Sequence, residues 1–128
     1  MKLEKNDFNN INLVFDDYED VDGSYTFDEY KITNVENFND TISIYFEVLT
    51  DIENDYKYTA LFIGYISIDL SKIIEFLNTN KYKLELSRLN LTDIIVKNGL
   101  ENSDFNPKDY KFEIENFVNE YITFYLEK

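Results

Sequence analysis

The most regular feature of this sequence is an alternation of apolar and polar side chains, the pattern of a β-strand with one buried face. The alternation is unbroken over residues 41–50, and we therefore predict a central strand there. The apolar positions in this stretch are Ile42, Ile44, Phe46 and Val48. Shorter alternations over 11–15 and 82–86 predict two further strands.

A turn signal follows the predicted strand over 11–15. The Asp-Gly pair at 22–23 precedes a new alternation that begins at Tyr25, and such a pair between alternating segments is typical of a β-hairpin. From Tyr30 onward the apolar positions change phase. Because one extra residue shifts the phase of a strand, we predict a β-bulge near residues 28–29.

The segment over residues 56–68 is the most apolar in the chain. It follows a polar turn at 51–55 and is almost continuously apolar over 60–66. A short, continuously apolar segment is typical of a strand that is covered on both faces. We therefore predict a second central strand here, buried on both sides.

Two segments have helical spacing. The first covers residues 69–77, with Asp69 as its expected N-cap and an end at Asn78. The second begins with a stronger signal, because Asn106 can act as the N-cap and Pro107 occupies the first helical position. For residues 92–97 the sequence allows two interpretations, a short helix or the first arm of a hairpin.

Aromatic residues at helical spacing follow this second start signal. Together with Ile114 they form an apolar face, at Tyr110, Ile114, Phe117, Tyr121 and Phe124, with spacings of four, three, four and three residues. The spacing predicts a helix from about Pro107 to Leu126 whose aromatic face packs into the core. Phe112 breaks the pattern and allows a strand over 110–114, but we prefer the helix. Antiparallel strands followed by helices indicate an α+β domain over residues 1–128, with an antiparallel sheet of about five strands and a C-terminal amphipathic helix packed on one face.

Composition narrows the possible chemistry. The chain lacks Cys, His and Trp, which excludes disulfide scaffolds, Cys or His nucleophiles and the usual His/Cys zinc sites. No Gly-rich phosphate loop with its Lys is present, nor a Ser or Lys nucleophile motif. We therefore expect no enzyme activity, no catalytic residues and no cofactor. Because we find no apolar leader and no membrane-spanning stretch, we expect a soluble, cytoplasmic protein.

The acidic hairpin region resembles an EF-hand calcium loop over a short stretch. The positions that match are Asp20, Asp22, Gly23, Tyr25, Thr26 and Glu29. The first ligand position holds Tyr18, which cannot supply a carboxylate, and the flanking segments have strand periodicity. An Asp-Gly hairpin explains the same residues, so we predict no metal site and leave calcium affinity as an open question.

Charge is the strongest pointer to function. The net charge is −14, and residues 1–60 carry 15 acids and 4 bases, a net of −11. Residues 16–29 hold seven acids and no base. This charge disfavours direct contact with nucleic acid and can attract a basic protein. Tyr beside carboxylates can anchor Arg or Lys side chains, although the same residues also suit a solvated hairpin. The predicted partner-binding residues are Asp16, Asp17, Tyr18, Glu19, Asp20, Asp22 and Tyr25.

Size, acidity and the lack of catalytic motifs favour an inhibitor that binds a basic protein. Our first hypothesis is an immunity protein, a monomer or weak dimer that neutralises a bacterial toxin such as a nuclease. The second is a phage-encoded inhibitor of a bacterial defence system, of the anti-CRISPR type, which acts as a nucleic-acid mimic. The third is a calcium-binding or structural module.

Overall fold

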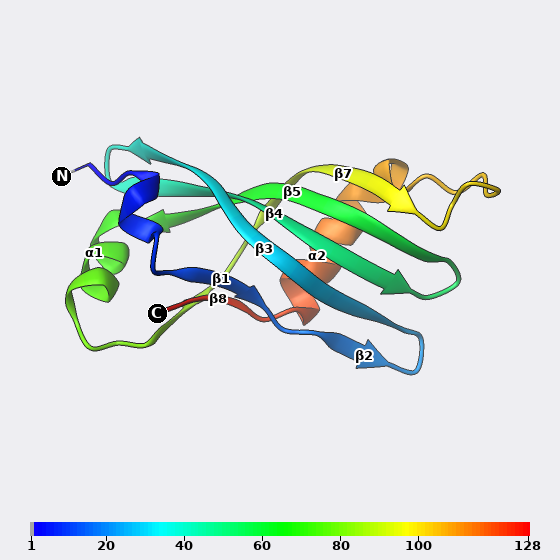
Figure 1. Ribbon diagram of the computed structural model, residues 1–128, viewed down its shortest axis with the longest axis horizontal. Coiled ribbons are helices and arrows are strands. Elements are labelled where there is room, and N and C mark those ends of the chain that lie inside the picture. The colour runs from blue at the N-terminus through cyan, green and yellow to red at the C-terminus, as the bar shows by residue number, and fades with distance from the viewer. Residues whose placement is uncertain (1) are drawn as a thin grey trace.

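The computed structural model describes residues 2–128 and has two antiparallel sheets with two helices (Figure 1). The main sheet contains, in spatial order, β2 (Tyr18–Asp20), β3 (Gly23–Phe38), β4 (Thr41–Glu53), β5 (Lys57–Asp69) and β7 (Asn90–Asn98). The second sheet contains β1 (Asn12–Phe15), β8 (Phe124–Glu127) and β6 (Lys83–Leu86). The helices are α1 (Leu70–Asn78) and α2 (Lys111–Tyr121), and two 3₁₀ turns are η1 (Lys5–Phe8) and η2 (Pro107–Tyr110). The α+β class with a main sheet of about five strands is confirmed.

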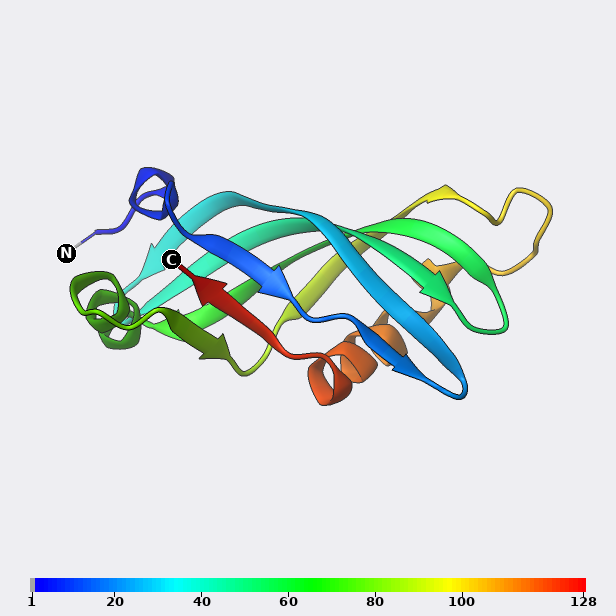
Figure 2. The ribbon, with the colours of Figure 1, turned by 60° about the horizontal axis from the view of Figure 1, so that its bottom comes forward.

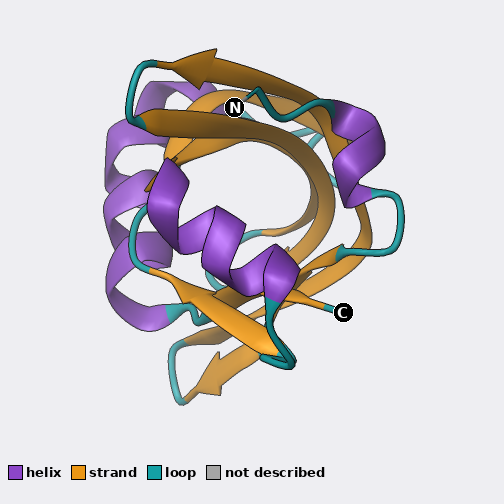
Figure 3. Ribbon diagram, turned by 90° about the vertical axis from the view of Figure 1, so that its left-hand side faces the viewer, coloured by secondary structure: helices purple, strands orange, loops and turns teal. Residues whose placement is uncertain are grey.

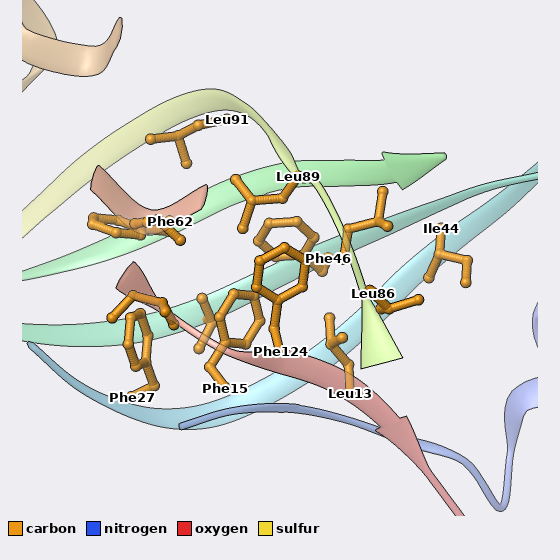
Figure 4. Packing of buried hydrophobic residues seen from close by; sticks show 14 of the residues in the cluster. Leu13, Phe15, Phe27, Ile44, Phe46, Phe62, Leu86, Leu89, Leu91 and Phe124 are labelled. Carbon is orange, nitrogen blue, oxygen red and sulfur yellow. The ribbon is translucent and has the colours of Figure 1, made fainter. Parts of the chain in front are cut away.

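The core lies between the two sheets. Seen along the strands, the main sheet curves around this core (Figure 3), and the second sheet lies across its concave side (Figure 2). Phe15 of β1 lies at the centre of an aromatic cluster (Figure 4). Its ring centroid is 5.1 Å from that of Phe27, 5.5 Å from that of Phe46 and 5.5 Å from that of Phe124. Four strands from both sheets therefore meet at one aromatic side chain.

The predicted central strands are the inner strands of the main sheet. β4 includes all of the predicted 41–50 segment and continues to Glu53, because its even-numbered residues face the core as far as Ile52. The predicted bulge is also present: the register of β3 against β4 shifts after Asp28, where Glu29 has a φ of 50°. The predicted turn is present, and Asp20 pairs with Gly23 across it. Its first arm is β2, whereas the predicted strand over 11–15 is β1, which pairs with β8 in the second sheet.

One prediction about β5 is wrong. Its even-numbered residues from Tyr58 to Ile66 are buried, but the outward side chains, such as Leu61 and Ile63, are only half-buried. Both the second sheet and α2 lie on the inner face of the main sheet, and α1 follows the end of β5. The apolar composition of β5 therefore reflects its inner position in the sheet rather than cover on both faces.

The first helix agrees with its prediction. It spans Leu70–Asn78, and Asp69 occupies the N-cap position. The Asp69 side chain makes no capping hydrogen bond, and the amide of Leu70 instead donates to the carbonyl oxygen of Asp40 at 2.8 Å. Residues 92–97, which the sequence left open, lie within strand β7.

The C-terminal helix is confirmed from Pro107 but ends earlier than predicted. η2 and α2 together reach Tyr121, with the Asn106 side chain accepting from the amide of Lys108 as a cap. The last predicted helical turn is strand β8, because it pairs with β1 on one side and β6 on the other. The aromatic face is also only partly core, since Tyr110 and Tyr121 are about half exposed.

β7 is an edge strand, and side chains of α2 make hydrogen bonds to its backbone and to the residue before it, in place of a further strand. Asn119 accepts from the amide of Leu89 at 2.8 Å and donates to its carbonyl oxygen at 3.0 Å. Glu115 accepts from the amide of Leu91 at 2.7 Å, and Lys111 donates to the carbonyl oxygen of Thr92 at 3.2 Å. The three helical residues are four positions apart and so share one face. They satisfy backbone groups that an edge strand would otherwise leave open.

Candidate functional site

The β2–β3 hairpin that carries most of the predicted binding residues is held by Asp20. One oxygen of its carboxylate accepts from the amides of Asp22 at 2.8 Å and Gly23 at 3.1 Å. The other oxygen accepts from the Tyr18 hydroxyl at 2.7 Å. These hydrogen bonds lower the pKa of Asp20, with the Tyr18 bond as the largest cause. Asp20 therefore shapes the turn, and its oxygens are already engaged.

Gly23 lets this hairpin approach the turn between β4 and β5. Its φ is +155°, and a Cβ atom there would lie 2.3 Å from the carbonyl oxygen of Glu53 and 3.0 Å from the Cβ of Asn54. No side chain fits in that space, so the residue must be glycine. The close approach places Asn54 beside the hairpin.

Aromatic side chains of α2 pack against the hairpin. Phe117 stacks on Tyr25 with ring centroids 4.8 Å apart and meets the ring of Tyr18 edge-on at 5.3 Å. Tyr121 lies 4.9 Å from Phe117 and 5.7 Å from Tyr18. Such pairs contribute about 0.5–1.5 kcal/mol each beyond the area they bury. The cluster fixes α2 against β2 and β3.

These residues enclose an open pocket of about 480 Å³, which we call the hairpin pocket. It is lined by Tyr18, Asp20, Asp22, Gly23, Ser24, Tyr25, Asn54, Phe117 and Tyr121. The lining is aromatic on the side of α2 and acidic at the turn, and it contains no basic residue. Its volume falls in the range of small-ligand pockets, about 300–1,000 Å³.

The two tyrosines of the hairpin differ in their surroundings. Tyr25 is 8 % exposed, and burial raises its pKa to about 12. Tyr18 is half-buried, and its pKa is raised to about 12 chiefly by its hydrogen bond to Asp20. Both phenols are therefore neutral at physiological pH. The ring of Tyr25 lies in the core cluster, so what it contributes to the hairpin pocket is its part of the lining rather than an exposed ring.

The remaining predicted residues are spread along the edge of the molecule. Asp17 accepts from the amide of Phe27 at 3.0 Å and so belongs to the base of the hairpin. Asp16 lies on the other side, where the Tyr125 hydroxyl donates to it at 3.4 Å. Glu19 and Asp22 are exposed on β2 and its turn. The structure therefore brings Tyr18, Asp20, Asp22 and Tyr25 together at one pocket, and leaves Asp16, Asp17 and Glu19 outside its lining.

The segment that resembles a calcium loop has the geometry of a hairpin. Within residues 2–128, no group of three or more acidic side chains is arranged to hold a metal ion. Asp20 is engaged by the turn and Tyr25 is buried.

Within residues 2–128, no helix has the length and apolar character needed to cross a bilayer.

Sequence reasoning missed three residues of the pocket: Asn54, Phe117 and Tyr121. The helical spacing placed Phe117 and Tyr121 on one face but assigned that face to the core. The signal that could have identified them is the tyrosine content of that face, since a Tyr hydroxyl usually needs a hydrogen-bond partner or water and so indicates a position at the edge of the core.

Comparison of the chain with known proteins found no matching family model, no matching curated protein and no matching solved structure.

Proposed function

We propose that this protein is an acidic inhibitor that binds and neutralises a basic partner protein through the β2–β3 hairpin. The observation that carries the proposal is the charge of this hairpin. No basic residue occurs between Lys5 and Lys31 in the sequence, the exposed Glu19 and Asp22 lie on the hairpin, and the exposed Asp16 lies just before it. A concentrated field of one sign steers a partner of the opposite sign and accelerates association.

The favoured partner is a basic bacterial toxin such as a nuclease, which would make this chain an immunity protein. The surface of a nuclease that binds phosphates is rich in Lys and Arg. A carboxylate-rich hairpin offers such a surface the same charge as its substrate. A nuclease of a bacterial defence system would present the same chemistry, so both kinds of nuclease belong in the test.

The test is binding kinetics with purified basic nucleases of both kinds, a bacterial toxin and a defence enzyme, measured by surface plasmon resonance. The test variant is D16N/E19Q/D22N, which spares Asp17 and Asp20 because these hold the hairpin. We expect a lower association rate and a loss of its salt dependence, because the Debye length falls from about 10 Å at 0.1 M to about 3 Å at 1 M salt.

A matched control removes the same charge at the opposite end of the molecule. D40N/D69N/E75Q changes two Asp and one Glu that are exposed near α1 (Figure 1). The control should leave the association rate close to that of the unmodified protein. Equal effects of the two triple variants would refute the hairpin as the docking surface, and so would no effect of either.

A further inference from the structure

We propose that the hairpin pocket receives an arginine side chain, with its guanidinium between the aromatic wall of α2 and the carboxylate of Asp22. This proposal deepens the proposed function, because it names the group of the basic partner that occupies the pocket. Three observations support it, which are the aromatic wall, the free polar groups and the hydrogen bonds by which Asp20 holds the turn.

The aromatic wall suits a planar cation. Tyr121 is 51 % exposed although its ring packs 4.9 Å from Phe117, so one face of the pair remains open. A guanidinium stacks on such rings and is more weakly hydrated than an ammonium group. The half-exposed rim of Tyr18 continues this wall toward the turn.

Two polar groups of the pocket remain free to bind. Asp22 is exposed, and no hydrogen bond or ion pair of its carboxylate occurs within residues 2–128. Tyr25 lines the pocket, and no hydrogen bond of its hydroxyl occurs in the same described region, although this oxygen is not among the buried unsatisfied atoms. A guanidinium carries five N–H donors, so it can serve a carboxylate and a phenol oxygen together.

The neighbouring acid, Asp20, has a structural role in the turn. One of its carboxylate oxygens accepts hydrogen bonds from two amides, and the other accepts one from the Tyr18 hydroxyl. It contributes negative charge and holds the turn, which orders the pocket before a ligand arrives. A rigid pocket of this kind loses less entropy on binding than a mobile loop does.

The experiment titrates the full-length protein with the capped tripeptide acetyl-Gly-Arg-Gly-amide and follows backbone amide shifts by NMR at low ionic strength. We expect saturable shifts at residues 20–25 and 117–121, with an affinity in the millimolar range. The lysine tripeptide should bind more weakly. The citrulline tripeptide has the same shape without the charge and should cause no saturable shift in this region.

The key variant is Tyr121→Ala, matched by Tyr110→Ala. Both tyrosines are about half exposed, but Tyr110 packs on Phe105 outside the pocket. Tyr121→Ala should weaken arginine binding about threefold to fivefold, the size expected of one exposed cation–π contact. Asp22→Asn should weaken it as well, and Tyr110→Ala should leave it unchanged.

Three results would overturn the arginine assignment: shifts outside the pocket only, equal binding of the citrulline tripeptide, or equal losses from Tyr121→Ala and Tyr110→Ala. These tests use no partner protein, so their failure is separable from failure of the inhibitor proposal. A partner that still associates through Asp16, Glu19 and Asp22 would then bind by charge alone.

Discussion

Thr50 is the buried polar side chain whose replacement should stabilise the fold. It lies on the inner face of β4, fully buried, and pairs with Phe27 of β3 and Ala60 of β5. Its hydroxyl has no hydrogen-bond partner in the described part of the chain. An unsatisfied buried hydroxyl costs about 1–3 kcal/mol, because it loses water without gaining a protein partner.

Thr50→Val replaces this hydroxyl with a methyl group and keeps the branched shape that suits a strand. The substitution removes the desolvation cost and adds about 0.8 kcal/mol for one buried methyl group. Allowing for imperfect packing of that methyl group, we expect the free energy of unfolding to rise by about 1–2 kcal/mol. For a chain of this size that corresponds to an increase in Tm of about 3–8 °C.

The assay is urea unfolding followed by circular dichroism, where the midpoint should rise with an unchanged m-value. Thr92→Val is the control, because the exposed Thr92 hydroxyl donates to the carbonyl oxygen of Ile63 at 3.0 Å. That variant should be neutral or slightly destabilised. A loss of about 1 kcal/mol or more in Thr50→Val would refute the reasoning, because it would mean that the hydroxyl is satisfied in solution.

Three further predictions follow from the packing and the pKa shifts. Asn119→Ala should cost about 1–3 kcal/mol in urea unfolding, because it leaves both backbone groups of Leu89 unpaired; a loss below about 0.5 kcal/mol would contradict a role in sealing the edge. Phe124→Ala should cost about 3–5 kcal/mol in the same assay, since this ring is 1 % exposed at the centre of the core, and a near-neutral result would contradict that placement. The protein should lose stability above pH 10, because burial raises the pKa of Tyr25 to about 12 and that of Tyr58 further. A group whose pKa is raised in the folded state contributes its full stabilisation below its unfolded pKa and loses it as the pH rises toward the folded value. Tyr25 alone should therefore account for a loss of about 2 kcal/mol in the free energy of unfolding by pH 12. Tyr25→Phe should remove this loss in alkaline unfolding monitored by tyrosinate absorbance.

Local sequence determined the elements whose signals depend on near neighbours. The unbroken alternation of β4 identified a strand, because every second residue of a strand faces the same side. The Asp-Gly pair and the phase change near Asp28 identified the hairpin and its bulge. The Asn106-Pro107 pair located the start of the C-terminal helix, since capping involves only the first helical turn.

The tertiary structure decided where that helix ends. Phe124 fits the helical spacing of Phe117 and Tyr121, and it also fits the alternation of Ile122 and Leu126. Local periodicity cannot choose between the two. The strand prevails because β8 pairs with β1, which is more than 100 residues away in the chain, and with β6.

The candidate site depends on long-range packing in the same way. The sequence identified the acidic hairpin from composition and from one turn signal, so Tyr18, Asp20 and Asp22 could be named in advance. Tyr121 lies about one hundred residues from that hairpin and reaches it only because α2 crosses the concave face of the main sheet. Charge is a property of the residues themselves, whereas a pocket requires walls from separate elements, and only the packing of those elements brings them together.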